Sequence, residues 1–245
     1  MTPANPSPSP EAWTLGSQDD RMAPVTLFGL ERSVYTRIAR LSLEEKSVPY
    51  VLHEVEIFAP AGVPPEHLDR HPFGRIPVLR HGDFALYETS AITRYVDEAF
   101  PGQSLQPAVP RVRARMNQVI GLLDSYAYRP MVWGVFVQRV RVPLGGGVPN
   151  EAEISSALLA SASCLAALER LVTPGPFLLG RDISLADLHV YPMFRYLSLA
   201  PEGHRLLSRH ADLGAWLEVM ASRPSVVGTR TRYERENGAT LRERT

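Results

Sequence analysis

The chain has 245 residues, 44% of them apolar, which suits two modest hydrophobic cores. Lysine plus arginine and aspartate plus glutamate both number 26, so no net charge draws the chain to nucleic acid or to an anionic membrane. The single cysteine, Cys164, excludes an internal disulfide framework and a multi-cysteine zinc site, and it favours a reducing, cytoplasmic location.

The first 22 residues are rich in proline and have neither the basic start nor the apolar centre of a secretory signal. We predict a disordered extension over residues 1–22. The longest apolar stretch elsewhere, residues 131–137, is far shorter than the roughly 20 residues that span a bilayer. The sequence therefore predicts no membrane segment.

Signals for strands and helices alternate between residues 23 and 100. Val34, Ile38 and Leu41, for example, repeat at helical spacing. The order is typical of a thioredoxin-like α/β domain, which we assign to residues 23–100. Its predicted strands are 25–29, 50–56, 76–80 and 84–87, and its predicted helices are 33–46, 65–70 and a helix that begins at 89.

Beyond a proline-rich linker the pattern becomes all-helical, and we predict an all-α domain over residues 110–228 and a flexible tail over 229–245. Ser184 and Asp187 have the spacing of a capping box, with aspartate in place of glutamate. The predicted helices are 110–141, 151–172, 184–198, 202–209 and 211–222.

The most informative motif spans residues 75–92. Pro77 interrupts an apolar strand and cannot donate to a sheet, so it is expected at a strand start, an edge or a bulge, after a trans or a cis bond. Ile76 would then keep its own N–H and C=O free to pair with an extended peptide. Glu88 and Thr89 stand where a helix begins, a position that receives a carboxylate, while Glu88 can pair with an ammonium group. The motif favours a small anionic peptide as ligand.

These residues resemble the cytosolic glutathione transferases. Thr26-Leu27-Phe28-Gly29 resembles their first strand, and Ser33-Val34-Tyr35-Thr36-Arg37 resembles the helix start of the serine-type members. The likeness covers roughly residues 25–228 and implies glutathione as co-substrate. It implies Ser33 as the catalytic residue and, as residues that bind glutathione, Arg75, Ile76, Pro77, Glu88 and Thr89.

A serine hydroxyl at Ser33 would act by stabilising the thiolate of glutathione. A thiol with a pKa near 8.5 is only about 3% ionised at pH 7, and a hydroxyl at a helix start can lower that pKa by about two units. Ser33 equally fits the role of an ordinary helix cap, and one hydroxyl can serve both roles. Tyr35 is the alternative hydroxyl, because other branches of the superfamily use tyrosine.

The resemblance further implies a cytoplasmic homodimer, active in detoxification, that attacks a small hydrophobic electrophile. One or two of Tyr126, Tyr128, Trp133 and Phe136 are expected to line the pocket for that electrophile. Two alternatives stay open: a glutathione-dependent isomerase, dehalogenase or etherase, and a non-catalytic, transferase-like binding module.

No metal site is predicted. His67 and His71 have the i, i+4 spacing of a helical pair of ligands, but the sequence offers no third ligand and Pro72 disturbs the turn.

Overall fold

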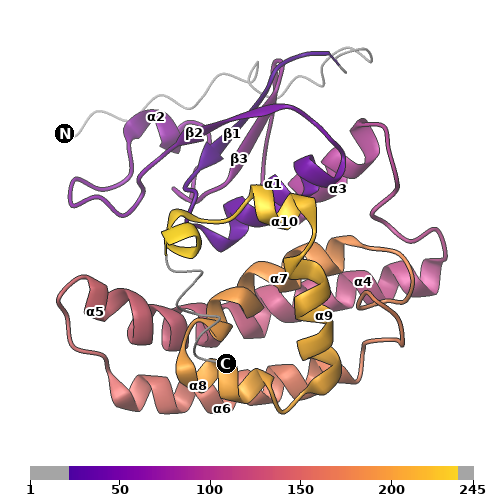
Figure 1. The fold of residues 1–245 in the computed structure, drawn as a ribbon. Coiled ribbons are helices and arrows are strands. Elements are labelled where there is room, and N and C mark those ends of the chain that lie inside the picture. The colour runs from indigo at the N-terminus through magenta and orange to yellow at the C-terminus, as the bar shows by residue number, and fades with distance from the viewer. Residues whose placement is uncertain (1–21, 237–245) are drawn as a thin grey trace, which may run out of the picture. The chain divides into compact units, whose positions relative to one another are not determined.

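The computed structural model describes residues 22–236 and divides the chain into two compact units, Met1–Pro101 and Gly102–Thr245 (Figure 1). Apart from Met22, the predicted disordered extension lies outside the described residues.

The first unit is a small α/β domain around a four-stranded sheet with the order β2-β1-β3-β4. β2 runs parallel to β1, whereas β3 is antiparallel to both β1 and β4. The thioredoxin-like prediction is confirmed. Along the chain the elements are β1 (Val25–Gly29), α1 (Val34–Glu45), β2 (Tyr50–Glu54), α2 (Pro65–Leu68), β3 (Val78–His81), β4 (Phe84–Tyr87) and α3 (Thr89–Ala99).

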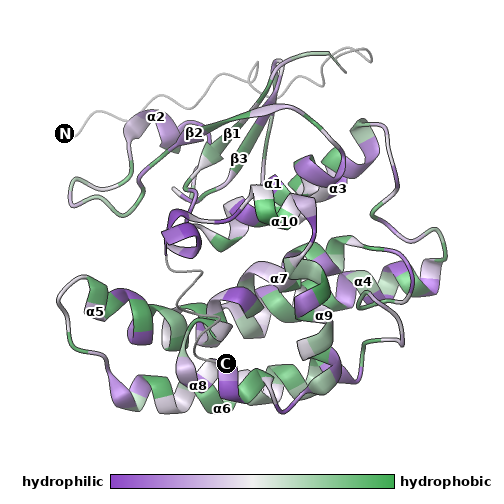
Figure 2. Cartoon of the chain, viewed as in Figure 1, coloured by the Kyte–Doolittle hydropathy of each residue, from purple (hydrophilic) through white to green (hydrophobic). Residues whose placement is uncertain are grey.

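Alternation along the strands divides this sheet into two apolar faces. On one face Leu27 and Leu79 pack against Ala39 of α1 and Ile92 of α3, and Figure 1 shows both helices on the same side of the sheet. The other face carries a smaller cluster made of Phe28, Val55 and Val78 with Ile57, Ile76 and Tyr87 around them. Figure 2 shows β1 mainly in the green of apolar residues, as expected for a strand with apolar side chains on both faces.

A left-handed residue follows the end of helix α1. Ser47 has φ 53°, a conformation that glycine adopts without penalty and that costs serine up to about 1 kcal/mol. One residue earlier, Lys46 forms an ion pair with Asp97 of α3 at 3.2 Å, with both side chains almost fully buried.

The second unit is helical, as predicted. In chain order its elements are α4 (Pro110–Leu122), η2 (Leu123–Ala127), η3 (Arg129–Arg141), α5 (Val142–Leu144), α6 (Glu151–Glu169), α7 (Leu185–Ser198), α8 (Pro201–Leu207), α9 (Ala211–Ala221) and α10 (Pro224–Gly228).

A continuous helix covers the predicted residues 110–141, but it is largely π-helical after residue 122. Both η2 and η3 are π-helical, with N–H groups bonded five residues back: Tyr128 donates to Leu123, and Val142 donates to Val137. Residues 131–137 are almost continuously apolar, so their pattern cannot distinguish an α period from the wider π period.

Helix α7 is the core of this unit, and nearly all of its residues are buried. Its start is fixed by the predicted capping box, in which Asp187 accepts the backbone N–H and the hydroxyl of Ser184 at 2.8 Å each. Asp187 also accepts the N–H of Leu178 at 2.9 Å and the indole N–H of Trp216 at 2.8 Å. Burial raises the pKa of Asp187, and these donors act in the opposite direction. One carboxylate therefore joins α7, α9 and the preceding loop.

The segment 229–236, predicted as part of a flexible tail, is bonded to α7. Thr231 and Glu234 cap each other: Glu234 accepts the N–H of Thr231 at 2.9 Å, and the Thr231 hydroxyl accepts the N–H of Glu234 at 3.3 Å. Arg195 donates to the same glutamate at 2.9 Å. Residues 232–236 therefore form a short capped helix that is bonded to Arg195, where a flexible tail was expected. The rest of the predicted tail lies outside the described residues.

Among the described helices only α6 is long and apolar enough to cross a membrane, as judged by length and composition. Core helices of soluble proteins pass the same test, so this is weak evidence for a span.

Candidate functional site

The sheet register brings the predicted site residues to one edge of the sheet. His53, Phe28, Val78 and Tyr87 lie opposite one another across the four strands. Because the end of β1, the start of β3 and the end of β4 share this edge, three segments continue from it side by side. They carry Ser33, the pair Ile76–Pro77, and the pair Glu88–Thr89.

Pro77 immediately precedes β3, and the Ile76–Pro77 bond is cis, one of the two forms expected from the sequence. Pro77 is buried and Ile76 half-buried. Within residues 22–236, neither the N–H nor the C=O of Ile76 makes a backbone hydrogen bond. The N–H and the C=O of Ile76 are therefore available to an extended peptide, and that pairing stays a prediction.

Arg75, the residue before Ile76, has an exposed side chain. Its carbonyl accepts a hydrogen bond from Nε2 of the fully buried His67 at 2.7 Å. This bond ties the backbone in front of Ile76 to helix α2.

Glu88 links β4 to α3 in a rare backbone conformation, with φ 70° and ψ 112°. Such a conformation costs a non-glycine residue about 1–3 kcal/mol and is found mainly at functional sites. The Glu88 side chain is exposed and caps no N–H of α3. In the described chain the N–H groups of Thr89 and Ser90 have no backbone acceptor, so the start of α3 can receive a carboxylate.

Ser33 caps α1. Its Oγ accepts the N–H of Thr36 at 3.3 Å, and its side chain is half-buried. Gly29 allows this helix start to approach the sheet, because a Cβ at Gly29 would lie only 2.4 Å from Oγ1 of Thr36. The cap leaves the hydroxyl proton of Ser33 free to donate elsewhere. Tyr35, the alternative hydroxyl, lies in the first turn of α1 and is half-buried.

A hollow of about 570 Å³ lies beside β2 and α2 in the same unit, and none of the predicted site residues lines it. It was not foreseen, because the loop over residues 57–64 has no periodic pattern that reveals a concavity. Its ionisable lining residues are His53, Glu54, Glu56, Glu66, His67 and Arg70.

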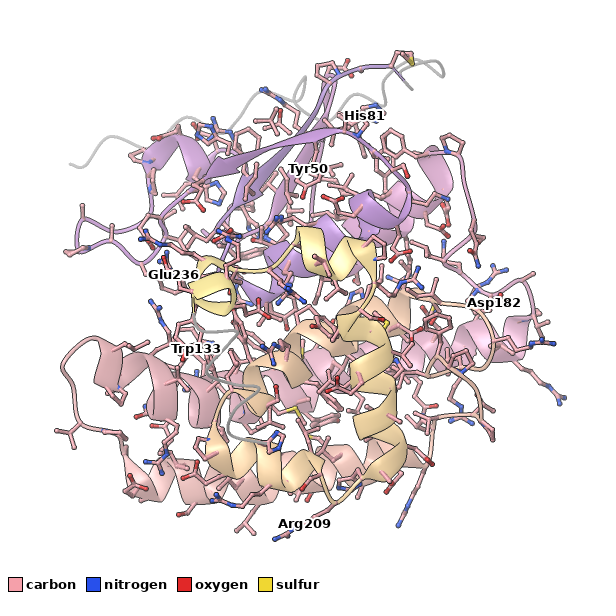
Figure 3. The ribbon with its side chains drawn as sticks, in the orientation of Figure 1. Tyr50, His81, Trp133, Asp182, Arg209 and Glu236 are labelled. Carbon is pink, nitrogen blue, oxygen red and sulfur yellow. The ribbon has the colours of Figure 1, made fainter. Side chains whose placement is uncertain are left out.

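Of the four aromatic residues expected near the electrophile, two have positions that argue against that role. Tyr126 is 69% exposed, and Phe136 is buried in a ring stack with Tyr196 at 4.2 Å. Trp133, labelled in Figure 3, donates its indole N–H to the hydroxyl of Tyr128 at 3.0 Å. The π-helical register explains this bond, since it places residues five apart on one face.

The two histidines considered as metal ligands and the single cysteine are buried. His67 and His71 lie with ring centroids 6.5 Å apart, and the described part of the chain contains no cluster of three or more groups suited to a metal ion. Cys164 is buried in α6, and burial raises the pKa of its thiol.

Sequence comparison agrees with this arrangement. The family model described as "Glutathione S-transferase, N-terminal domain" matches residues 27–104, and "Glutathione S-transferase, C-terminal domain" matches residues 151–218. Glutathione S-transferase F10 of Arabidopsis thaliana is 30% identical over 188 residues, which cover 76% of this chain and 86% of that protein.

Solved structures give the same answer. The crystal structure of glutathione transferase F7 from Populus trichocarpa has a TM-score of 0.73 at 28% identity and covers 84% of this chain and 97% of that one. Glutathione S-transferase I from maize, solved in complex with an atrazine glutathione conjugate, has a TM-score of 0.73 at 27% identity, with coverages of 84% and 96%. The chain therefore belongs to the glutathione S-transferase family.

Proposed function

We propose that this protein is a glutathione transferase of the serine type, which activates the thiol of glutathione for attack on a small apolar electrophile. One observation carries the proposal: within residues 22–236, Ile76, Thr89 and Ser90 have backbone groups that make no backbone hydrogen bond, and they lie on segments that continue from the same sheet edge as those of Glu88 and Ser33. A donor, an acceptor, an anion-binding helix start and a carboxylate complement the groups of a γ-glutamyl tripeptide.

Each residue has a distinct role in this proposal. Ile76, fixed by Pro77, pairs with the cysteinyl backbone of glutathione, while the start of α3 at Thr89 receives a carboxylate and Glu88 receives the ammonium. Arg75 is exposed and long enough to approach the second carboxylate from solvent.

Ser33 would donate its hydroxyl proton to the sulfur, since its lone pair already serves Thr36. Stabilising the thiolate by about 2.7 kcal/mol lowers the thiol pKa by about two units, which makes about half of the bound glutathione nucleophilic near pH 6.5. Retention of this hydroxyl supports catalysis over a binding module without activity.

Membership of the family supports the remaining proposals. We propose a cytoplasmic homodimer that takes part in detoxification, and a substrate of the general kind represented by the maize conjugate, an apolar molecule with an electrophilic carbon. In the first unit Phe58 and Phe73 are 58% and 72% exposed, which supplies apolar surface for association. Light scattering at micromolar concentration measures the mass directly.

The test of the catalytic proposal is Ser33→Ala. The thiol pKa of bound glutathione, followed by the ultraviolet absorbance of the thiolate, should rise by about two units, and conjugation of chlorodinitrobenzene near pH 6.5 should fall roughly fiftyfold. Ser155→Ala, which removes an exposed hydroxyl on α6, is the matched control and should change neither quantity. A Ser33→Ala enzyme with an unchanged thiol pKa would assign the role to another group, with Tyr35 the first candidate.

A further inference from the structure

His71 is a buried imidazole that connects the loop in front of Pro77 to the strand that leads to Glu88. It is only 2% exposed, and its Nδ1 accepts the backbone N–H of Phe73 at 3.3 Å. Its ring lies over that of Tyr87, with the centroids 4.6 Å apart. Its carbonyl accepts the N–H of Gly74 at 2.8 Å. Residues 71–74 are thus joined by one side-chain and one backbone hydrogen bond, both accepted by His71.

The protonation state of this ring follows from the hydrogen bond. An Nδ1 that accepts an N–H carries no proton, so the neutral ring has its single proton on Nε2. A second proton taken from solvent would bind Nδ1, the atom that the Phe73 N–H already occupies. Two N–H groups would then face each other, and the tie between His71 and Phe73 would break.

Charged and titratable groups surround His71 from each neighbouring segment: Glu88 from the start of α3, His67 from α2, Arg75 from the loop and Tyr87 from β4. Burial lowers the pKa of His71 below its usual value of 6.5, His67 and Arg75 lower it further, and Glu88 opposes them. The neutral ring is accordingly the state at neutral pH. Glu88 is also the carboxylate offered to the ammonium of glutathione.

We propose that neutral His71 is a positioning residue for glutathione, and that its protonation both loosens the loop bearing Ile76 and places a competing cation next to Glu88. Acid then weakens glutathione binding through His71, while the thiol chemistry at Ser33 is a separate process. This inference rests on the proposed function, because it assigns Ile76 and Glu88 to the binding of glutathione.

S-methylglutathione separates the two processes, because it has no ionisable thiol, and its carboxylates and ammonium titrate outside the range from pH 5.5 to 7.5. Calorimetric titration of the full chain should show an affinity that falls between pH 7.5 and 5.5, most steeply at the acid end, because the pKa of His71 lies below 6.5. In steady-state kinetics with glutathione, the KM for glutathione should rise over this range beyond the change expected from the thiol alone.

The decisive variant is His71→Asn, whose side-chain oxygen can accept the Phe73 N–H and does not titrate. It should bind S-methylglutathione at pH 7.5 within about twofold of the wild type, with little change down to pH 5.5. His53→Gln removes an exposed histidine of β2 as the matched control and should keep the wild-type pH dependence. In the free wild-type protein the amide resonance of Phe73 should shift over the same pH range, a readout that needs no variant.

The outcomes are distinguishable. If the wild type binds S-methylglutathione equally at both pH values, or if His71→Asn keeps the wild-type pH dependence, the role of His71 is wrong and the proposed function stands. If the wild type does not bind at pH 7.5, the proposed function fails and this inference fails with it. A Phe73 resonance that does not move with pH contradicts the role of His71 even where the His71→Asn chain fails to fold.

Discussion

Removal of the Asp187 carboxylate should destabilise the helical unit by an amount set by its hydrogen bonds. In Asp187→Ala the N–H groups of Leu178, Ser184 and Trp216 lose their acceptor, and each of these residues is at most 5% exposed. An unsatisfied buried donor costs about 1–3 kcal/mol, so at least about 3 kcal/mol of unfolding free energy should be lost.

Asp187→Asn should cost less. Its amide oxygen can replace the carboxylate oxygen that accepts from Leu178 and Trp216, and the Ser184 hydroxyl can rotate to accept from the new NH₂. Only the Ser184 N–H is then left without an acceptor, which predicts a loss of about 1–3 kcal/mol.

Urea unfolding followed by far-ultraviolet circular dichroism measures both losses without relying on the fluorescence of Trp216. Asp182→Ala is the control, because Asp182 is exposed in the loop just before α7 (Figure 3). This substitution should change the unfolding free energy by less than about 0.5 kcal/mol. If Asp187→Ala were as stable as Asp182→Ala, the carboxylate would not hold these elements together.

Three further predictions concern a backbone conformation, a buried ion pair and a buried thiol. Ser47→Gly should raise the unfolding free energy by up to about 1 kcal/mol, because the left-handed conformation of residue 47 carries no penalty for glycine, and a loss of stability would contradict this. Lys46→Met should lower it by up to about 3–5 kcal/mol, because the buried Asp97 loses the ammonium group 3.2 Å away, and Lys46→Met combined with Asp97→Leu should recover most of that loss. Cys164 should react with iodoacetamide at pH 7.5 much more slowly in the native protein than in urea, because burial raises the pKa of its thiol; equal rates would show that it is accessible.

Local chemistry made most of the first unit predictable. The strand predicted over residues 25–29 has the bounds observed for β1. The missing N–H of Pro77 predicted a place at a strand start, an edge or a bulge, and Pro77 directly precedes β3, which begins two residues later than the predicted strand. The spacing of Ser184 and Asp187 predicted the start of α7 for the same reason: a cap depends on residues close in sequence.

Features that depend on distant contacts could not be predicted in this way. The positive φ of Glu88 is imposed by the junction of β4 and α3, not by the residue itself, since glutamate has no preference for it. The acceptors of the Trp216 indole and the Arg195 guanidinium lie far away in sequence. The exposure of Tyr126 depends on which face of η2 is covered, and no local pattern determines that.

The site itself was foreseen as a set of residue types, and the register of the sheet supplied their proximity. His71 was noted only as a weak metal-ligand candidate, because the sequence places it next to a proline and gives no sign of its contact with Tyr87. The acceptor role of its Nδ1 is visible only in three dimensions.

The central claim is that the edge formed by Ile76, Glu88 and Thr89 holds glutathione. Isothermal titration calorimetry of the full chain with glutathione at pH 7.5 tests it most directly: we expect saturable heat with a dissociation constant below about 1 mM, weakened at least about tenfold by Glu88→Ala. Folded protein that gives no binding heat with millimolar glutathione would contradict the claim.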